Sequence, residues 1–275
     1  MERKLIPMVE SYDTNVEYLY NKTYLFIKGF AEGLKLENTL KALPLARKMH
    51  DGQFRKGLQT VEIVNHIIDE NGIVTNIPTT ISVHLPYILH CLKVCSTLIS
   101  LDIPWSTKDL DVLYTCAILH DTLEDCEEYF PKNGEEYVLE YGFPVEVKDT
   151  IRLLSKHTGS DEFELNQYFN SIKKNKYALL VKMADRSHNV EDLYNMKNIP
   201  KYIDETRKYF LIKNSIVSYG KQNYPELSNA LTILKSKILS LTEATEFMLN
   251  QQENIIKEKD EEIIKLKEEI EKLKK

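Results

Sequence analysis

The stretch Ala117-Ile118-Leu119-His120-Asp121-Thr122-Leu123-Glu124-Asp125 decides how this 275-residue chain is interpreted. Apolar periodicity predicts that it ends a helix, which Ser106 and Asp109 begin as a capping box. Residues three and four apart share a helix face, so His120 and the three carboxylates are expected to lie together. Carboxylates near a helix C-terminus repel one another and oppose the helix dipole, and a bound cation would reverse that penalty. The alternative is a solvated acidic helix end, but the apolar residues before His120 favour a metal site.

Length and composition predict one sizeable helical domain with an appendage, because the chain holds only nine glycines and nine prolines. The net charge of −6, with no strongly basic block, argues against nucleic-acid binding as the main task. The N-terminus has no apolar h-region and no run is long enough to cross a bilayer, so no membrane partner is expected. Four cysteines form no CxxC pair, and a reducing cytoplasm is the expected location.

Apolar periodicity also predicts helices over most of the remaining chain. The expected helices cover residues 12–33, 37–50, 86–94, 145–156, 161–172, 178–189 and 199–220, with a long one from Pro225. The exception is 58–83, where two β-branched runs flank Asn71-Gly72, a dipeptide typical of hairpin turns. The sequence therefore predicts an all-α bundle with an inserted β-hairpin and a long C-terminal helix.

Two further polar residues interrupt apolar helices. His90 lies in a run where a histidine is by default a hydrogen-bonded core residue. Asp185 follows the apolar run 178–181 and is expected to point into the protein, where an unpartnered carboxylate is unfavourable. The alternative for Asp185 is a surface ion pair with Lys182. With His120 and Asp121 these residues give two imidazoles and two carboxylates, a set that suits Mn²⁺ or Fe²⁺ better than a closed structural zinc site.

Four motifs, in the same order, resemble the hydrolase domain of the RelA/SpoT family, which belongs to the HD phosphohydrolase superfamily. They are His50-Asp51-Gly52-Gln53-Phe54-Arg55-Lys56-Gly57, Pro86-Tyr87-Ile88-Leu89-His90, Leu119-His120-Asp121-Thr122-Leu123-Glu124-Asp125 and Lys182-Met183-Ala184-Asp185-Arg186-Ser187-His188-Asn189. The resemblance covers roughly residues 38–220, and residues 58–83 stand between the first two motifs. No segment resembles the family's synthetase domain, so the chain is similar to small stand-alone hydrolases.

The resemblance implies an HD-domain helical bundle that removes the 3′-pyrophosphate from the nucleotide (p)ppGpp, giving GDP or GTP and pyrophosphate. It implies that Mn²⁺, or another divalent ion such as Fe²⁺, is held by His90, His120, Asp121 and Asp185. It implies that the attacking water is positioned and deprotonated by Glu124 and Asp125. It implies that the guanosine nucleotide and its phosphates are held by Arg55, Lys56 and Asn189.

Other functions remain open from the sequence. Arg55 and Lys56 could clamp phosphate, although an isolated Arg-Lys pair is usually only surface charge. The substrate could instead be another nucleotide, such as NADPH or a dNTP. An inactive nucleotide-sensing module is a second alternative, although a pure sensor would not need Glu124 and Asp125. A scaffold whose purpose lies in its C-terminal tail is a third.

The predicted domain organisation has three parts: a helical extension over 1–36, the HD hydrolase domain over 37–224 with the hairpin insertion at 58–83, and a long helix over 225–275. A coiled coil is expected from about residue 249, because apolar residues recur every seven residues at Leu249, Ile256, Ile263 and Ile270. Ile at a with Leu at d favours a parallel two-stranded coil and hence a homodimer. A single solvated helix is the alternative, since Gln252 and Lys259 occupy two d positions.

Overall fold

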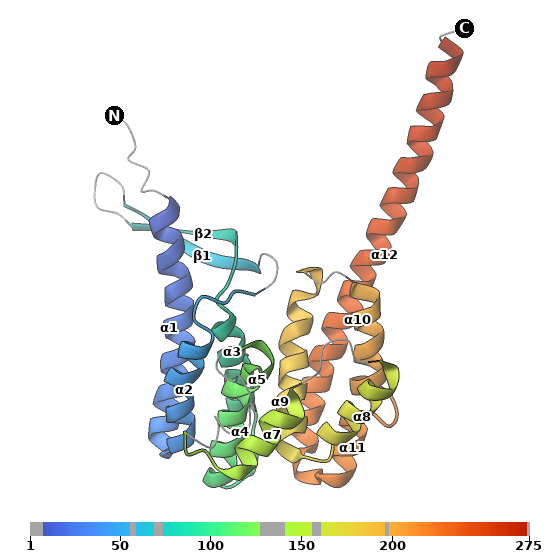
Figure 1. The fold of residues 1–275 in the computed structure, drawn as a ribbon. Coiled ribbons are helices and arrows are strands. Elements are labelled where there is room, and N and C mark those ends of the chain that lie inside the picture. Colours follow the sequence, from blue (N-terminus) through green and yellow to red (C-terminus); the bar gives the residue numbers. More distant parts are fainter. Residues whose placement is uncertain are drawn as a thin grey trace.

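The computed structural model of the protein describes residues 8–55, 59–68, 74–126, 141–155, 161–195 and 198–273 (Figure 1). The α-helices of these ranges are α1 (Met8–Leu34), α2 (Glu37–Met49), α3 (Tyr87–Ile99), α4 (Thr107–Leu119), α5 (Thr122–Asp125), α7 (Val145–Leu154), α8 (Glu162–Ile172), α9 (Lys176–Asn189), α10 (Ile199–Thr206), α11 (Ile216–Asn223) and α12 (Ser228–Leu273). Shorter turns are the 3₁₀ segments η2 (Val190–Asn195) and η4 (Pro225–Leu227) and the π-helical η3 (Arg207–Leu211). The predicted all-α class, with a long C-terminal helix, is confirmed.

Two strands lie inside the segment 58–83. β1 (Gln59–Ile68) and β2 (Val74–Val83) pair antiparallel, with Gln59 opposite Val83 and Ile68 opposite Val74. Each strand is longer than the β-branched run from which it was predicted. The expected turn at Asn71-Gly72 lies outside the described residues.

Helix α4 forms the centre of the fold. Every residue from Asp111 to Leu119 is buried, because α2, α3, α7 and α9 surround this helix. A helix that is buried on all sides carries apolar residues all round rather than along one stripe. The core that it anchors is continuous and also includes Ile27 of α1 and Leu231 of α12.

One buried carboxylate joins α4 to α2. The N-cap position of α2, Leu36, has no side-chain cap, so the first amides of α2 need an acceptor from elsewhere. Asp111 of α4 supplies it, since its Oδ2 accepts from Asn38 N at 3.1 Å and its Oδ1 from Thr39 N at 2.8 Å. The hydroxyl of Thr39 donates to the same carboxylate at 2.7 Å. This cap in trans fixes α2 against the central helix.

Two predicted helices are broken in the structure, and both predictions were wrong in this respect. The helix expected through Asp125 ends at Leu119, and α5 restarts at Thr122. The hydroxyl of Thr122 donates to the carbonyl of Leu119 at 2.6 Å, which caps α4 at that point. The helix expected over 199–220 is divided into α10, η3 and α11. Asn214 adopts a left-handed φ of 67°, which a continuous right-handed helix cannot contain.

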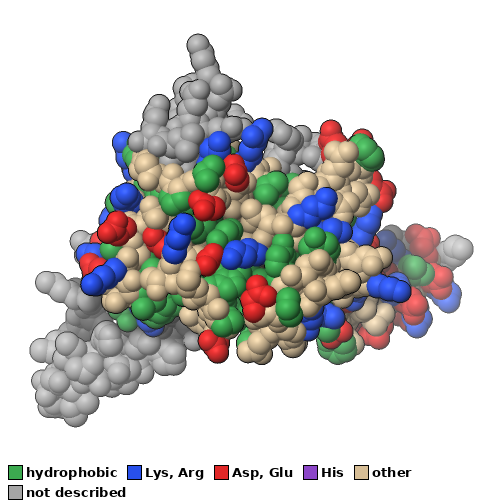
Figure 2. Space-filling view, turned by 90° about the horizontal axis from the view of Figure 1, so that it is seen from below, with side chains coloured by type: hydrophobic (Ala, Val, Ile, Leu, Met, Phe, Trp, Pro, Cys, Tyr) green, Lys and Arg blue, Asp and Glu red, His purple; other side chains and the backbone are tan. Residues whose placement is uncertain are grey.

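Helix α12 changes environment along its length. Its first half packs on α9, η2 and α11, and its second half projects away from the bundle (Figure 1). The face seen in Figure 2 carries Lys, Arg, Asp and Glu side chains interspersed, without a large area of one sign. Among the described residues, no helix has the combination of length and apolar character that crossing a bilayer requires.

Gly220→Ala is expected to destabilise the protein, because a methyl group at this buried position in α11 has no room. A Cβ there would lie 2.6 Å from Leu231 Cδ1 and 3.1 Å from Leu179 Cδ1, and both leucines are fully buried. Overpacking of this kind typically costs about 1–3 kcal/mol. Thermal and urea unfolding of the variant provide the measurement.

The matched control is Gly29→Ala, at an exposed position inside α1 where an added Cβ meets nothing within 4 Å. Replacing glycine in a helix interior should stabilise the protein by about 0.5–1 kcal/mol. Equal unfolding midpoints for the two variants would show that α11 and α12 are not packed as described.

Candidate metal centre

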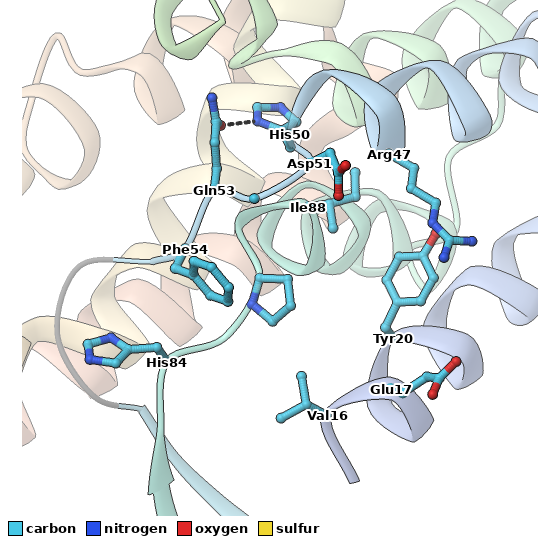
Figure 3. Close-up of a pocket in the computed structure, with 12 residues that line it drawn as sticks. Val16, Glu17, Tyr20, Arg47, His50, Asp51, Gln53, Phe54, His84 and Ile88 are labelled. Carbon is cyan, nitrogen blue, oxygen red and sulfur yellow. Dashed lines mark hydrogen bonds between the residues drawn. The ribbon is translucent and has the colours of Figure 1, made fainter. Parts of the chain in front are cut away.

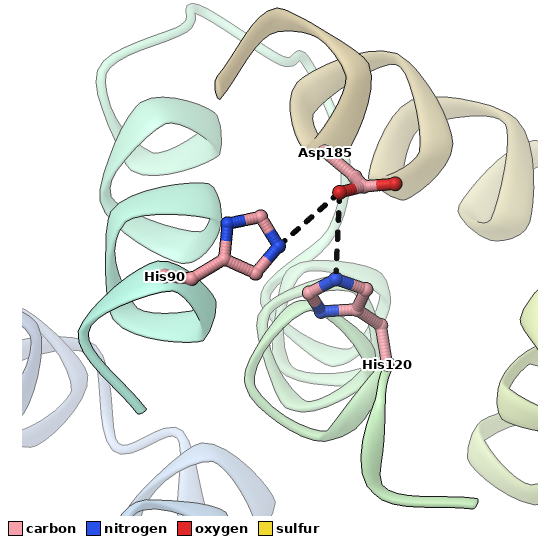
Figure 4. Close-up of side chains that lie close together, drawn as sticks. All are labelled: His90, His120 and Asp185. Carbon is pink, nitrogen blue, oxygen red and sulfur yellow. Dashed lines mark ion pairs between the residues drawn. The ribbon is translucent and has the colours of Figure 1, made fainter. Parts of the chain in front are cut away.

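Three helices bring four side chains together at the end of α4. His90 comes from α3, Asp185 from α9, and His120 and Asp121 from the junction between α4 and α5. Nε2 of His90 lies 3.2 Å from Asp185 Oδ1 and 3.5 Å from Asp121 Oδ2. Nε2 of His120 lies 3.0 Å from Asp121 Oδ2 and 3.8 Å from Asp185 Oδ1. Figure 4 shows both rings directed at the Asp185 carboxylate.

The break between α4 and α5 orients His120. Its Nδ1 donates to the carbonyl of Ala117 at 2.9 Å, one turn earlier in α4. That bond places the ring proton on Nδ1 and leaves Nε2 directed at the two carboxylates. His120 Nε2 is buried and, among the described residues, has no hydrogen-bond partner, although Asp121 lies close to it.

A divalent cation fits this arrangement. When His120 gives up the proton on Nε2, that atom offers a lone pair to a cation, because Nδ1 keeps the proton that it donates to the carbonyl of Ala117. Metal–ligand bonds to nitrogen and oxygen are near 2.0–2.2 Å, so neighbouring ligand atoms of one ion lie about 3 Å apart. The separations within this cluster are 3.0–3.8 Å. His90, His120 and Asp185 are all buried and offer their ligand atoms within 4.8 Å of one another.

Asp185 is held by two neighbours on its own helix. Lys182 Nζ donates to Oδ2 at 2.8 Å, and Asn189 Nδ2 donates to Oδ1 at 2.5 Å. The ion pair with Lys182 that was the alternative interpretation therefore exists, but it is buried rather than on the surface, because the side chains are only 16% and 5% exposed. Oδ1 remains directed at both histidines.

His188 contacts His90 from the side opposite the carboxylates. The two Nδ1 atoms lie 2.8 Å apart, so one donates to the other. Burial, with His90 and Arg55 nearby, lowers the pKa of His188 to about 2, so this ring stays neutral and can accept. When His90 offers its Nε2 lone pair to a cation, its proton lies on Nδ1 and is donated to His188. His188 is thus a positioning residue for a ligand.

Tyr87 closes the cluster on the side of Asp121. Its hydroxyl donates to Asp121 Oδ2 at 2.8 Å, and its ring stacks on His50 at a centroid distance of 5.1 Å. Burial and the Asp121 charge raise the pKa of Tyr87, so the hydroxyl remains a donor. His50 in turn hydrogen-bonds Gln53, whose Nε2 donates to the carbonyl of Asp125 at 2.8 Å. These bonds tie the loop after α2 to α5.

The charges of the cluster stabilise one another. Burial opposes ionisation of His120, but Asp121 and Asp185 outweigh it and hold the pKa of His120 well above its usual value. Burial likewise opposes ionisation of Asp185, but Lys182 and the two histidines hold its pKa well below its usual value. A cation must displace protons from the histidines, so its affinity is expected to rise with pH.

The predicted acid pair lies beside the cluster, at the end of α5. Glu124 and Asp125 are both exposed when the surface of the whole residue is counted. Partial burial of the carboxyl group and the negative charge of Asp121 raise the pKa of Asp125, although Tyr87 and His50 oppose the change. A carboxylate with a raised pKa is a better proton acceptor than a free one.

Of the predicted phosphate-binding residues, two meet in the structure. Arg55 donates to Asn189 Oδ1 at 2.9 Å and lies 3.4 Å from Asp192 Oδ2. Because Asn189 also bonds Asp185, Arg55 stands one side chain away from the histidine–carboxylate cluster. Lys56 lies outside the described residues.

A cavity of about 430 Å³ lies next to the same loop (Figure 3). Phe54, Gln53 and His50 form one wall and the helix α1 residues Val16 and Tyr20 the other. Phe54 lines this cavity, whereas its neighbour Arg55 contacts Asn189. The loop therefore presents Phe54 to the cavity and Arg55 to the neighbourhood of the metal cluster.

Three residues complete the cluster, and sequence reasoning gave no role to Tyr87 and His188 and only the alternative role of a surface partner for Asp185 to Lys182. All three stand inside the quoted motifs, next to or near a predicted ligand. The signal for His188 was a second histidine three residues after Asp185 in an otherwise buried helix. What the sequence could not show is that this ring faces His90, which lies 98 residues earlier.

Comparison with known families agrees with this geometry. Residues 87–190 match the family model of the HD domain. The match starts at Tyr87 and ends just after Asn189, so it contains His90, His120, Asp121 and Asp185. The HD domain is the domain of metal-dependent phosphohydrolases, and the match supports a place in that superfamily.

His188→Leu is expected to weaken Mn²⁺ binding about 10–100-fold, because it leaves the Nδ1 proton of His90 without an acceptor. His188→Asn keeps a carbonyl oxygen near the same place and should retain most of the affinity. Isothermal titration of both variants with Mn²⁺ provides the comparison. Wild-type affinity in His188→Leu would show that His188 does not orient the ligand.

Proposed function

We propose, from the match of residues 87–190 to the HD domain, that this protein removes the 3′-pyrophosphate from (p)ppGpp and releases GDP or GTP and pyrophosphate. The observation that carries the proposal is the cluster of two imidazoles and two carboxylates, in which His90, His120 and Asp185 are buried and offer ligand atoms within 4.8 Å of one another. The choice of this nucleotide is supported by the resemblance of four motifs to the RelA/SpoT hydrolase domain.

We propose Mn²⁺ as the metal, with Fe²⁺ as the alternative, held by His90, His120, Asp121 and Asp185. A nitrogen–oxygen ligand set without a thiolate suits these ions. When bound, the ion supplies Lewis-acid chemistry, because it offsets charge on the phosphate and makes water a stronger nucleophile. His188 and Ala117 O hold the two imidazoles in the tautomer that this requires.

Two residues are proposed as the proton-handling pair. Glu124 and Asp125 stand at the exposed end of α5, next to Asp121. The raised pKa of Asp125 favours uptake of a proton from an attacking water, and Glu124 is proposed to position that water. Tyr87 stays protonated and keeps Asp121 oriented.

Substrate binding is proposed to use the positive side of the loop after α2. Arg55 carries a permanent charge and a planar set of donors that matches phosphate oxygens. Asn189 and Asp192 hold this guanidinium at the edge of the cluster. We propose the same role for Lys56, on the strength of the motif. A cytoplasmic location is proposed as well, since all four cysteines are unpaired.

The deciding experiment compares substrates with purified full-length protein and Mn²⁺. It offers ppGpp, pppGpp, NADPH and dNTPs separately, and the products are resolved by ion-exchange chromatography. We expect GDP and pyrophosphate from ppGpp, with loss of turnover after chelation. Turnover of NADPH or a dNTP alone would assign a different nucleotide, and binding of ppGpp without products would assign a sensing module.

Glu124→Gln is expected to keep the metal and the substrate but to lower kcat about 10²–10⁴-fold, because the amide keeps the shape and cannot accept a proton. Steady-state kinetics with metal analysis of the same sample measure this effect. Glu258→Gln, an equivalent change on the exposed part of α12, is the control. If Glu124→Gln turns over at the wild-type rate, Glu124 takes no part in the chemistry.

Arg55→Ala is expected to raise KM more than it lowers kcat, because Arg55 is proposed to bind phosphate rather than to take part in bond cleavage. Arg55→Lys keeps the charge and loses the planar donors, so it should lie between wild type and Arg55→Ala. Measured kcat and KM for both variants separate these effects. A wild-type KM in Arg55→Ala would place the substrate elsewhere.

A further inference from the structure

The C-terminal half of α12 stands away from the bundle (Figure 1). Along it runs an apolar stripe that is in contact with water. Every residue from 250 to 273 is exposed. The stripe includes Ile256, Ile263 and Ile270, which are 59%, 46% and 50% exposed, and Leu266, which is 50% exposed. Apolar residues recurring every 3.5 positions along one face are typical of helices that pair with another helix.

The same stripe is already used in the first half of the helix. Counting back by heptads from Leu249 at position a, the a and d positions include Leu231, Ile238, Thr242 and Thr245, all of which are buried. These residues pack into the core on α9, η2 and α11. Arg207 pairs with Glu246 where this packing ends. The same face of α12 continues beyond Leu249, where it is exposed rather than packed on the bundle.

We propose that residues 249–273 pair with the same segment of a second copy of this chain in a parallel, two-stranded coiled coil that begins where α12 leaves its own core. The bundle occupies the stripe up to Thr245, so the coil cannot extend further toward the N-terminus. The segment 249–273 spans about 25 residues, or about 37 Å at 1.5 Å per residue.

Charge on the flanking positions selects the parallel orientation. In a parallel pair, a residue at g faces the residue five positions later, at e, of the partner helix. Glu262 at g then faces the second copy's lysine at position 267, and the twofold symmetry doubles this pair. In an antiparallel pair g faces g, so Glu262 would face the glutamate at the same position of the second copy and lose its lysine partner.

The two polar d positions limit the stability of the coil. Gln252 and Lys259 replace apolar residues in the first two heptads, and Lys259 pairs with Glu262 of its own helix at 2.7 Å. The fully apolar part is short, so association should depend on protein concentration in the micromolar range.

The pairing does not complete the metal centre. All of the cluster residues, from Arg55 to Asp192, belong to one chain and lie outside α12. Monomeric variants should therefore keep metal binding and turnover. This separates the outcome of the test from that of the proposed hydrolase function.

The first test is the mass of the full-length protein between 1 and about 100 µM by light scattering and sedimentation. We expect twice the chain mass of 32.1 kDa at the high end. Ile263→Asp, at an a position, should give a monomer. Ile264→Asp, at the neighbouring outward position and similarly exposed, should remain a dimer. A monomeric wild type, a larger oligomer, or equal effects of the two variants would overturn the proposal.

The second test concerns charge. Lys267→Glu should weaken dimerisation about tenfold, because two attractive pairs become repulsive. The double variant Glu262→Lys/Lys267→Glu should recover much of it. The control is Lys265→Glu, which makes the same change in net charge at an outward position. This variant also loses the helix-surface pairs of Lys265 with Glu261 and Glu269. Loss of dimer in Lys265→Glu equal to that in Lys267→Glu would contradict the interhelical pairs.

The third test fixes the orientation. The four native cysteines are buried, so a single cysteine at Gln252→Cys can be oxidised selectively. A parallel pair places the two introduced thiols opposite each other at a d position, and we expect a disulfide-linked dimer. An antiparallel pair over 249–273 would separate them by about 27 Å. A dimeric protein that does not cross-link at this position would overturn the parallel arrangement.

Discussion

The structure depends on the need to hold four ionisable side chains together at one point, with His90, His120 and Asp185 buried and Asp121 partly buried. Two carboxylates in a protein interior are unfavourable unless each is compensated by hydrogen bonds or opposite charge. Here Lys182 and Asn189 compensate Asp185, and Tyr87 compensates Asp121. His120 Nε2 makes no hydrogen bond within the described residues, and its compensation is the charge of Asp121, 3.0 Å away. The protons of the two histidines thus balance the carboxylates, and a divalent cation at the same point would take their place.

The surrounding helices hold these side chains in position. Helix α4 is buried on all sides and ends where His120 must be presented. Helix α9 places Asp185, His188 and Asn189 on neighbouring faces within two turns. The buried carboxylate of Asp111 fixes α2 to α4, and the loop after α2 then carries Arg55 to Asn189. A substitution at Asp111 would therefore disturb the substrate side of the cluster as well as lower the stability of the protein.

The errors of sequence interpretation have a common physical cause. The periodic pattern runs unbroken through His120 and through residues 199–220, and both segments are broken in the structure. Periodicity reports which side of a segment is apolar, and it does not report a local turn that a single hydroxyl or a left-handed residue introduces. Thr122 and Asn214 make those breaks, and neither is a proline or glycine that would have marked them.

The sequence by itself determined the helical class, the order of the motifs and the identity of the candidate ligands, because these depend on local pattern and residue chemistry. It also determined the heptad stripe of the tail. Only the tertiary structure decided which atoms face one another. The contact between His90 and His188, the buried pairing of Lys182 with Asp185 and the placement of Arg55 beside Asn189 join segments that are distant in sequence or that a helical wheel leaves ambiguous. Such contacts follow from how the helices pack, which no local pattern encodes.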